Sequence, residues 1–304
     1  MRPAASLMRP RHLQFLRPLR TPRFPTRFST ASNADGDLIP LKDRFNLAGK
    51  SYIVTGGGRG IGYAAARAVA EVGGNVSILD LAPSPVKDFE NLSREFGVKT
   101  KYIRTDITQE ESVTQAFEET IGDFGKLDGC VTAAGVCPEG DFAEHNLADV
   151  KRCFDVNITG TFLAAQQTTK ALLRQNTPGS IVMIASISGS CVNPGVKLSA
   201  YSASKGAVRM LCTELGVELA PVGIRVNSIS PGYIDTELLA PLKAAQPKRM
   251  ELMRNEPPLK RIGNRNDLTP AVVYLLSDAS SYMTGGEIVI SGGIHCGRIE
   301  SPYL

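Results

Sequence analysis

The sequence predicts an α/β protein with one seven-stranded parallel sheet and helices on both of its faces. Seven short runs rich in β-branched residues follow one another from Lys50 onward, and longer segments with helical periodicity separate them. This alternation is typical of a doubly wound parallel sheet. No linker rich in Pro, Gly or Ser and no internal repeat divides residues 40–304, which indicates a single domain.

The expected strands, in chain order, are Ser51–Thr55, Asn75–Asp80, Thr100–Thr105, Leu127–Thr132, Ser180–Ala185, Ile224–Ile229 and Glu287–Ile290. The segments between them carry apolar residues at helical spacing, for example Val113, Phe117 and Ile121, or Ala64, Ala68 and Val72. Such stripes predict helix faces that pack on the sheet. They carry no information about function.

The first 35 residues differ from the rest of the chain in composition. They hold seven Arg, no Lys and a single acid, Asp35, so the remaining residues carry a net charge of −2 although the whole chain carries +4. A basic segment rich in Ser and Thr and nearly free of acids is typical of a mitochondrial transit peptide. We therefore expect residues 1–35 to direct residues 36–304 to the mitochondrial matrix. A basic tail on a cytoplasmic protein is the alternative.

Composition also argues against several kinds of partner. The basic excess lies entirely in the leader, so the charge does not indicate a nucleic-acid partner. No apolar run approaches the roughly 20 residues that span a bilayer. Six Cys without a Cys-x-x-Cys pair and three dispersed His predict no metal site.

A glycine-rich loop follows the first expected strand. The run Gly56-Gly57-Gly58-Arg59-Gly60-Ile61-Gly62 leads into a helix that begins near Tyr63. Glycines at positions 56, 60 and 62 allow a tight turn and close approach of a pyrophosphate, which the amides of the helix N-terminus then bind. The strand, loop and helix together predict a dinucleotide site in a Rossmann-type sheet.

The second expected strand ends in Asp80, 18 residues after Gly62. A carboxylate at this place accepts hydrogen bonds from the ribose hydroxyls of the adenosine and repels a 2′-phosphate. Asp80 therefore predicts NAD as the cofactor. Arg59 is long enough to reach a 2′-phosphate, so NADP is the alternative.

Three side chains form a candidate acid/base group. Tyr201 and Lys205 share one face of an expected helix, and we expect the ammonium to lower the pKa of the phenol from its usual value of about 10. Ser186 follows a strand at the edge where parallel sheets bind ligands. Ser188 is an alternative to Ser186. We favour Ser186, because Gly189 stands three residues after Ser186.

With these motifs the sequence resembles the short-chain dehydrogenase/reductase family, in its compact single-domain branch, over about residues 45–293. The matching motifs are Thr55–Gly62, Ser186–Gly189 and Tyr201–Lys205, in this order. The resemblance implies cofactor contacts from Thr55, Gly56, Gly60, Ile61, Gly62, Asp80, Asp106, Asn157, Tyr201, Lys205, Pro231, Gly232, Ile234 and Thr236. It also implies a homo-oligomer, either a dimer or a tetramer.

The resemblance further implies catalytic roles. Hydride moves between the nicotinamide and a carbinol or carbonyl carbon, Tyr201 exchanges the hydroxyl proton, and Ser186 orients the oxygen. Lys205 holds the nicotinamide ribose, and Asn157 anchors a water that links Lys205 to solvent. Two segments depart from the family pattern: Thr132-Ala133-Ala134-Gly135, where sheet-bracing asparagines are usual, and Ser291-Gly292-Gly293 near the end.

The substrate is less readable. Residues Ile184–Gly189 followed by Asn193-Pro194 are similar to fungal polyol dehydrogenases and ketose reductases acting on arabinitol, mannitol, sorbose or xylulose. We therefore expect a small-molecule sugar alcohol/ketose pair as substrate. Five prolines around residues 233–263 predict short helices that form a substrate lid. A mitochondrial 3-oxoacyl carrier-protein reductase and a catalytically silent NAD-binding scaffold are the alternatives.

Overall fold

A computed structural model describes residues 38–86 and 88–297 of the chain. The predicted sheet of seven parallel strands is present, and its strands lie in the order β3-β2-β1-β4-β5-β6-β9. They are β1 Ser51–Thr55, β2 Asn75–Asp80, β3 Thr100–Arg104, β4 Gly129–Thr132, β5 Gly179–Ile184, β6 Ile224–Pro231 and β9 Glu287–Ile290. Residues 1–35, the expected transit peptide, lie outside the described part.

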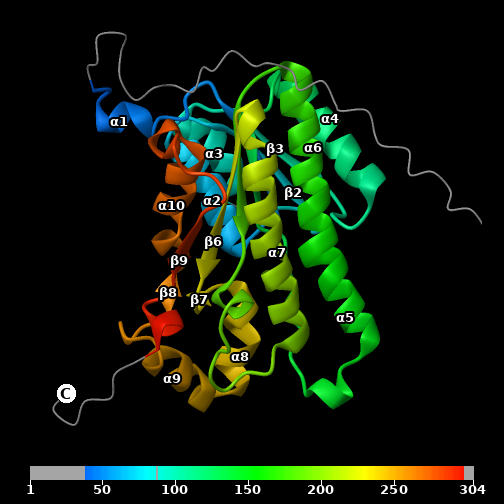
Figure 1. Ribbon diagram of the computed structural model, residues 1–304, viewed down its shortest axis with the longest axis vertical. Helices are drawn as coiled ribbons and strands as arrows, with labels where there is room; N and C mark the ends of the chain where they lie inside the picture. Colours follow the sequence, from blue (N-terminus) through cyan, green and yellow to red (C-terminus); the bar gives the residue numbers. More distant parts are fainter. Residues whose placement is uncertain (1–37, 87, 298–304) are drawn as a thin grey trace, which may run out of the picture.

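Helices cover both faces of this sheet (Figure 1). One apolar core joins α2, α3 and α10 to the sheet, and a second joins α4, α6 and α7 to the opposite face. Within β1, Tyr52 and Val54 belong to the first core and Ile53 to the second. Because both faces are covered, the inner strands β1, β4, β5 and β6 are buried along nearly their whole length, whereas the edge strands β3 and β9 are only partly buried.

The described helices are α1 Leu41–Arg44, α2 Gly60–Glu71, α3 Phe89–Phe96, α4 Glu110–Phe124, α5 Leu147–Phe154, α6 Gly160–Gln175, α7 Ser199–Glu218, α8 Ala240–Ala245, α9 Pro247–Asn255 and α10 Thr269–Leu276. Local sequence sets several of their ends. Asn146 caps α5 by accepting a hydrogen bond from Ala148 N at 2.8 Å. The predicted face of α4 is confirmed, because Val113 and Phe117 are buried.

The expected lid is held at both ends by a second, two-stranded sheet that the sequence did not predict. Its strands are β7 Ile234–Asp235 and β8 Gly263–Asn264, which pair in parallel. The 3-10 turn Glu237–Leu239 and helices α8 and α9 lie between them. Strands of two residues give no periodic signal, and this is why pattern analysis missed them.

No helix of the described residues is both long enough and apolar enough to cross a membrane.

Candidate active site

Two adjoining cavities lie beyond the carboxyl ends of the strands, where the sheet order reverses between β1 and β4. The larger, about 630 Å³, is lined by the glycine loop and the ends of β2 and β3. The smaller, about 320 Å³, is lined by the ends of β5 and β6, the start of α7 and the lid. Their shared wall of Ala133, Gly135, Val136 and Thr236 makes one continuous site.

The first turn of α2 packs so closely against the glycine loop that position 62 has no room for a side chain. A Cβ at Gly62 would stand 2.2 Å from the carbonyl oxygen of Gly56, and Gly56 itself has a φ of +64°. Gly56 and Gly60 therefore bring bare backbone to the wall of the larger cavity. This cradle fits a dinucleotide pyrophosphate.

Two carboxylates border the larger cavity as predicted. Asp80 accepts hydrogen bonds from Gly58 N at 2.9 Å and from Ala82 N at 3.0 Å, which fix its carboxylate at the end of β2. Asp106 accepts from both the amide and the hydroxyl of Thr108. Arg59 lines the same cavity. The residue that favours NAD, Asp80, and the residue that could favour NADP, Arg59, therefore both border it.

Tyr201 and Lys205 lie on the first turns of α7 and both line the smaller cavity. The Lys205 ammonium is 5% exposed, stands 5.8 Å from the centre of the Tyr201 ring and donates to Ile184 O at 2.7 Å. This hydrogen bond ties α7 to the end of β5. Helix and strand therefore set the position of the ammonium together.

The two candidate serines have different partners. The Ser188 hydroxyl accepts a hydrogen bond from Asn193 Nδ2 at 2.7 Å. Ser186 Oγ accepts from Ser188 N at 3.1 Å, and its hydroxyl interacts with Tyr201. The geometry therefore favours Ser186 as the serine that acts with Tyr201, while Ser188 and Asn193 complete the cavity wall.

Asn157 lies in a π-helical turn, Asp155–Thr159, that joins α5 to α6. Its amide accepts from Val136 N and donates to Val136 O, both at 2.9 Å, and donates to Ser204 Oγ at 2.9 Å. Asn157 is fully buried and belongs to the lining of neither cavity. Asn157 thus braces the loop after β4 against α7, and its expected contact with a water stays a prediction.

The end of β6 and the segment that follows it lie where the two cavities meet. Pro231, Gly232, Ile234 and Thr236 all line the smaller cavity, as does Ile61 from the glycine loop. A Cβ at Gly232 would stand 2.8 Å from Ser291, so the backbone there passes close to the end of β9. Thr55 is buried at the end of β1, and Ala134 N donates to its hydroxyl at 3.4 Å.

Comparison with known proteins decides the family. A family model described as enoyl-(acyl carrier protein) reductase matches residues 56–295. A solved short-chain type dehydrogenase/reductase from Mycobacterium marinum superposes with a TM-score of 0.81 at 38% identity, covering 84% of this chain and 100% of that one. The chain belongs to the short-chain dehydrogenase/reductase family. It is therefore an oxidoreductase.

Several curated relatives in this family are similar over nearly their whole length. An NADP-dependent mannitol dehydrogenase of Hypocrea jecorina is 36% identical, covering 83% of this chain and 95% of its own. A sorbose reductase of Candida albicans is 36% identical over 84% and 90%. A 3-oxoacyl-[acyl-carrier-protein] reductase of Aquifex aeolicus is 33% identical over 82% and 98%. The cofactor of this chain is NAD(H) or NADP(H), in agreement with the cradle.

The prediction that the pKa of Tyr201 is lowered is wrong in this structure. Burial raises the pKa of the Tyr201 phenol above its usual range, and the Ser186 hydroxyl opposes the rise only in part. Burial also lowers the pKa of Lys205 to about 8. Both shifts have the same main cause, because removal from water disfavours the charged form of either group.

Several residues at the site were given no functional role from the sequence. Gly58 borders Asp80, where a Cβ would stand 2.9 Å from the carboxylate, and the run of three glycines was a signal for it. Asn193, Glu139 and Arg249 line the smaller cavity. Their positions depend on contacts between distant segments, so no local pattern indicated the last two.

The buried Lys205 ammonium leads to a prediction about stability. Its folded pKa of about 8 lies below the usual 10.5, so the unfolded chain holds this proton more tightly. The fold is therefore destabilised below pH 8, and the penalty disappears as the pH rises from about 8 to 10.5. Lys205→Met should stabilise the protein at pH 7 by about 2 kcal/mol, after allowing for the lost hydrogen bond to Ile184.

Urea unfolding at pH 7 and pH 10 measures this effect, which should be smaller at the higher pH. Lys170→Met, at an exposed position on α6, is the control and should change stability by less than about 0.5 kcal/mol. A Lys205→Met protein less stable than the wild type at pH 7 would contradict the prediction.

Proposed function

We propose that this protein transfers hydride between NAD(H) and a sugar alcohol/ketose pair. The observation that carries the proposal is the smaller cavity, in which Tyr201 and Ser186 share a wall with further polar groups. Its volume of about 320 Å³ suits a small substrate. The mannitol dehydrogenase and sorbose reductase relatives support the same substrate class.

The residues of the site suggest how the proton moves. When bound, the nicotinamide accepts or supplies the hydride. Tyr201, protonated at neutral pH because burial raises its pKa, donates its proton to the carbonyl oxygen in reduction. In oxidation the phenol must first lose its proton, and its oxygen then accepts the proton of the alcohol. Lys205, whose pKa is about 8, can exchange a proton near neutrality. A Cβ at Gly135 would stand 3.7 Å from Lys205 Nζ and 3.4 Å from Asn157 Oδ1, so both face the same space.

A second function is a 3-oxoacyl carrier-protein reductase. The Aquifex aeolicus relative and the description of the family model favour it. Polar groups in the lining of the smaller cavity, among them Ser188, Asn193 and Arg249, favour the polyol hypothesis, because an aliphatic chain leaves them without partners.

The homo-oligomer also stays a prediction. Exposed apolar side chains on α6 and α7, among them Phe162, Met210 and Val217, support it.

The first test is turnover of a polyol panel with NAD by the wild type and Tyr201→Phe. Removal of the phenol should lower kcat by about 10²–10⁴, the usual range for a general acid/base, while NADH binding measured by fluorescence stays within twofold. Near-normal turnover by Tyr201→Phe would sink the assignment. A wild type that binds NADH but turns over no substrate of the panel, nor a 3-oxoacyl thioester, would support the scaffold alternative.

The second test concerns cofactor choice. We predict that the wild type prefers NAD(H), and that Asp80→Ala shifts the ratio of kcat/KM for the two cofactors towards NADP(H) by about 10- to 100-fold, since a repulsive charge is removed. Asp88→Ala, an exposed carboxylate in the connection after β2, is the control and should leave the ratio unchanged. A wild-type preference for NADP(H) would show that Arg59 outweighs Asp80.

The third test concerns the leader. We propose that residues 1 to about 32 are removed on import into mitochondria, which the Arg-rich, acid-poor composition supports. N-terminal sequencing of protein from its native source should therefore begin near residue 33. An intact Met1 in the cytoplasmic fraction is the outcome that rejects the proposal.

A further inference from the structure

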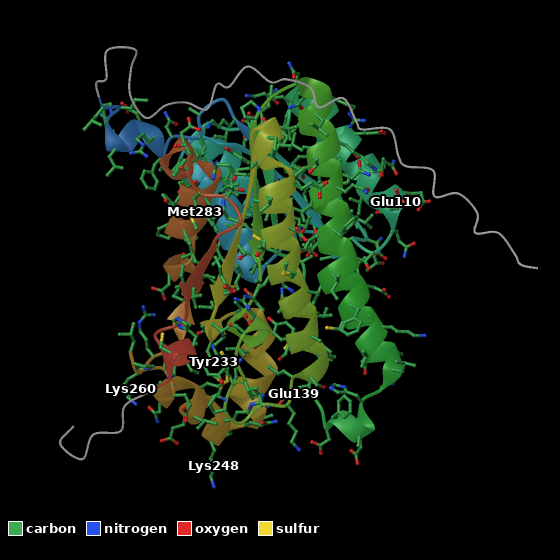
Figure 2. The ribbon with its side chains drawn as sticks, in the orientation of Figure 1. Glu110, Glu139, Tyr233, Lys248, Lys260 and Met283 are labelled. Atoms are coloured by element: carbon green, nitrogen blue, oxygen red, sulfur yellow. The ribbon has the colours of Figure 1, made fainter. Side chains whose placement is uncertain are left out.

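An ion pair joins the lid to the loop after β4 across the smaller cavity. Arg249, on α9, donates to Glu139 at 2.6 Å between Nη2 and Oε2, although 110 residues separate the two in sequence. Both side chains line the cavity that holds Tyr201 and Ser186. Figure 2 shows Glu139 at the end of the molecule where α8 and α9 lie.

Arg249 has hydrogen-bonding capacity that the protein does not use. Its Nη1 reaches only a distant acceptor, Gln246 Oε1 at 3.4 Å. Its Nε is buried and has no hydrogen-bond partner among the described residues. Its side chain is 18% exposed. A buried donor without an acceptor is rare in a folded protein, and in a cavity wall it indicates a site where an acceptor atom of a ligand receives this hydrogen bond.

The Cys137 thiol interacts electrostatically with the ion pair and with Lys205. Cys137, two residues before Glu139, also lines the cavity. Burial raises the pKa of the Cys137 thiol to about 12, while Lys205 and Arg249 both oppose the rise. The thiol is therefore close to both cations. Because Tyr201, Glu139 and Arg249 line one cavity of about 320 Å³, a compact substrate whose reacting carbon is at Tyr201 can extend to Glu139 and Arg249.

We propose that Glu139 and Arg249 form a specificity site that binds the hydroxyl groups of the substrate distant from the reacting carbon. The inference rests on the proposed polyol function and names the residues that recognise it. The Glu139 carboxylate accepts a hydrogen bond from one hydroxyl, and the guanidinium donates to its neighbour. An alkyl chain in the same place satisfies neither group and is disfavoured.

The test compares the wild type with Glu139→Gln and Arg249→Met on D-mannitol, D-arabinitol and 2-butanol, a secondary alcohol without distal hydroxyls. Each variant should raise KM for the polyols by about 10- to 100-fold with kcat within about threefold, because the lost contacts are made equally in the ground and transition states. The kcat/KM for 2-butanol should change less than threefold.

Asp141→Asn is the matched control. Asp141 lies on the same loop as Glu139 and forms an ion pair with Lys197, but it is not part of the wall of the smaller cavity. This variant should keep the polyol KM within about twofold. A comparable rise in it would show that the ion pairs only hold the loop, and would overturn the proposal.

Other outcomes also discriminate. Equal losses for polyols and 2-butanol, a fall in kcat at unchanged KM, or no change in either variant overturns the specificity site while the polyol function stands. A wild type that turns over none of the polyols overturns the proposed function, and the specificity site with it.

Discussion

The parallel pairing of β4 with β1 on one side and β5 on the other is the constraint on which the site depends. Thr132 pairs with Thr55 and with Met183, so the loops that follow these three strands start at one level of the sheet. Gly129 permits this pairing, because a Cβ there would stand 2.0 Å from the carbonyl oxygen of Ser180. Since the chain order reverses at this point, the loops diverge and leave space for a dinucleotide.

Two buried cations show how the protein separates structure from chemistry. Arg225, 9% exposed, donates to Ser280 Oγ and to the carbonyls of Leu275, Ser277 and Met283. Its charge is distributed over four acceptors and holds the end of α10 against β6. Lys205 is buried to a similar degree. Among the described residues, however, its ammonium has a single hydrogen-bond acceptor, Ile184 O. A cation so weakly compensated releases its proton readily, which suits proton exchange and lowers stability.

Regular structure was readable from the sequence because it repeats. The seven main strands were found to within two residues at their ends, and the glycine loop and the Tyr201–Lys205 pair fell on the predicted elements. The pKa of Tyr201 was predicted with the wrong sign. Spacing showed that Lys205 was near, whereas the effect of burial depends on the walls of the cavity, which come from distant segments.

In residues 233–263, the expected lid, local sequence patterns do not predict the tertiary contacts. Gly263 N donates to Tyr233 O at 2.8 Å, and β7 pairs with β8, so both ends of segment 233–263 are anchored beside the end of β6. With its ends anchored, α9 lies across the smaller cavity, and Arg249 meets a loop that leaves the sheet at β4. The local sequence of α9 predicts a polar helix and nothing more. Arg249 is part of the cavity only because residues 233–263 pack against the loop that follows β4. Tertiary structure therefore determines which residues can contact the far end of a substrate.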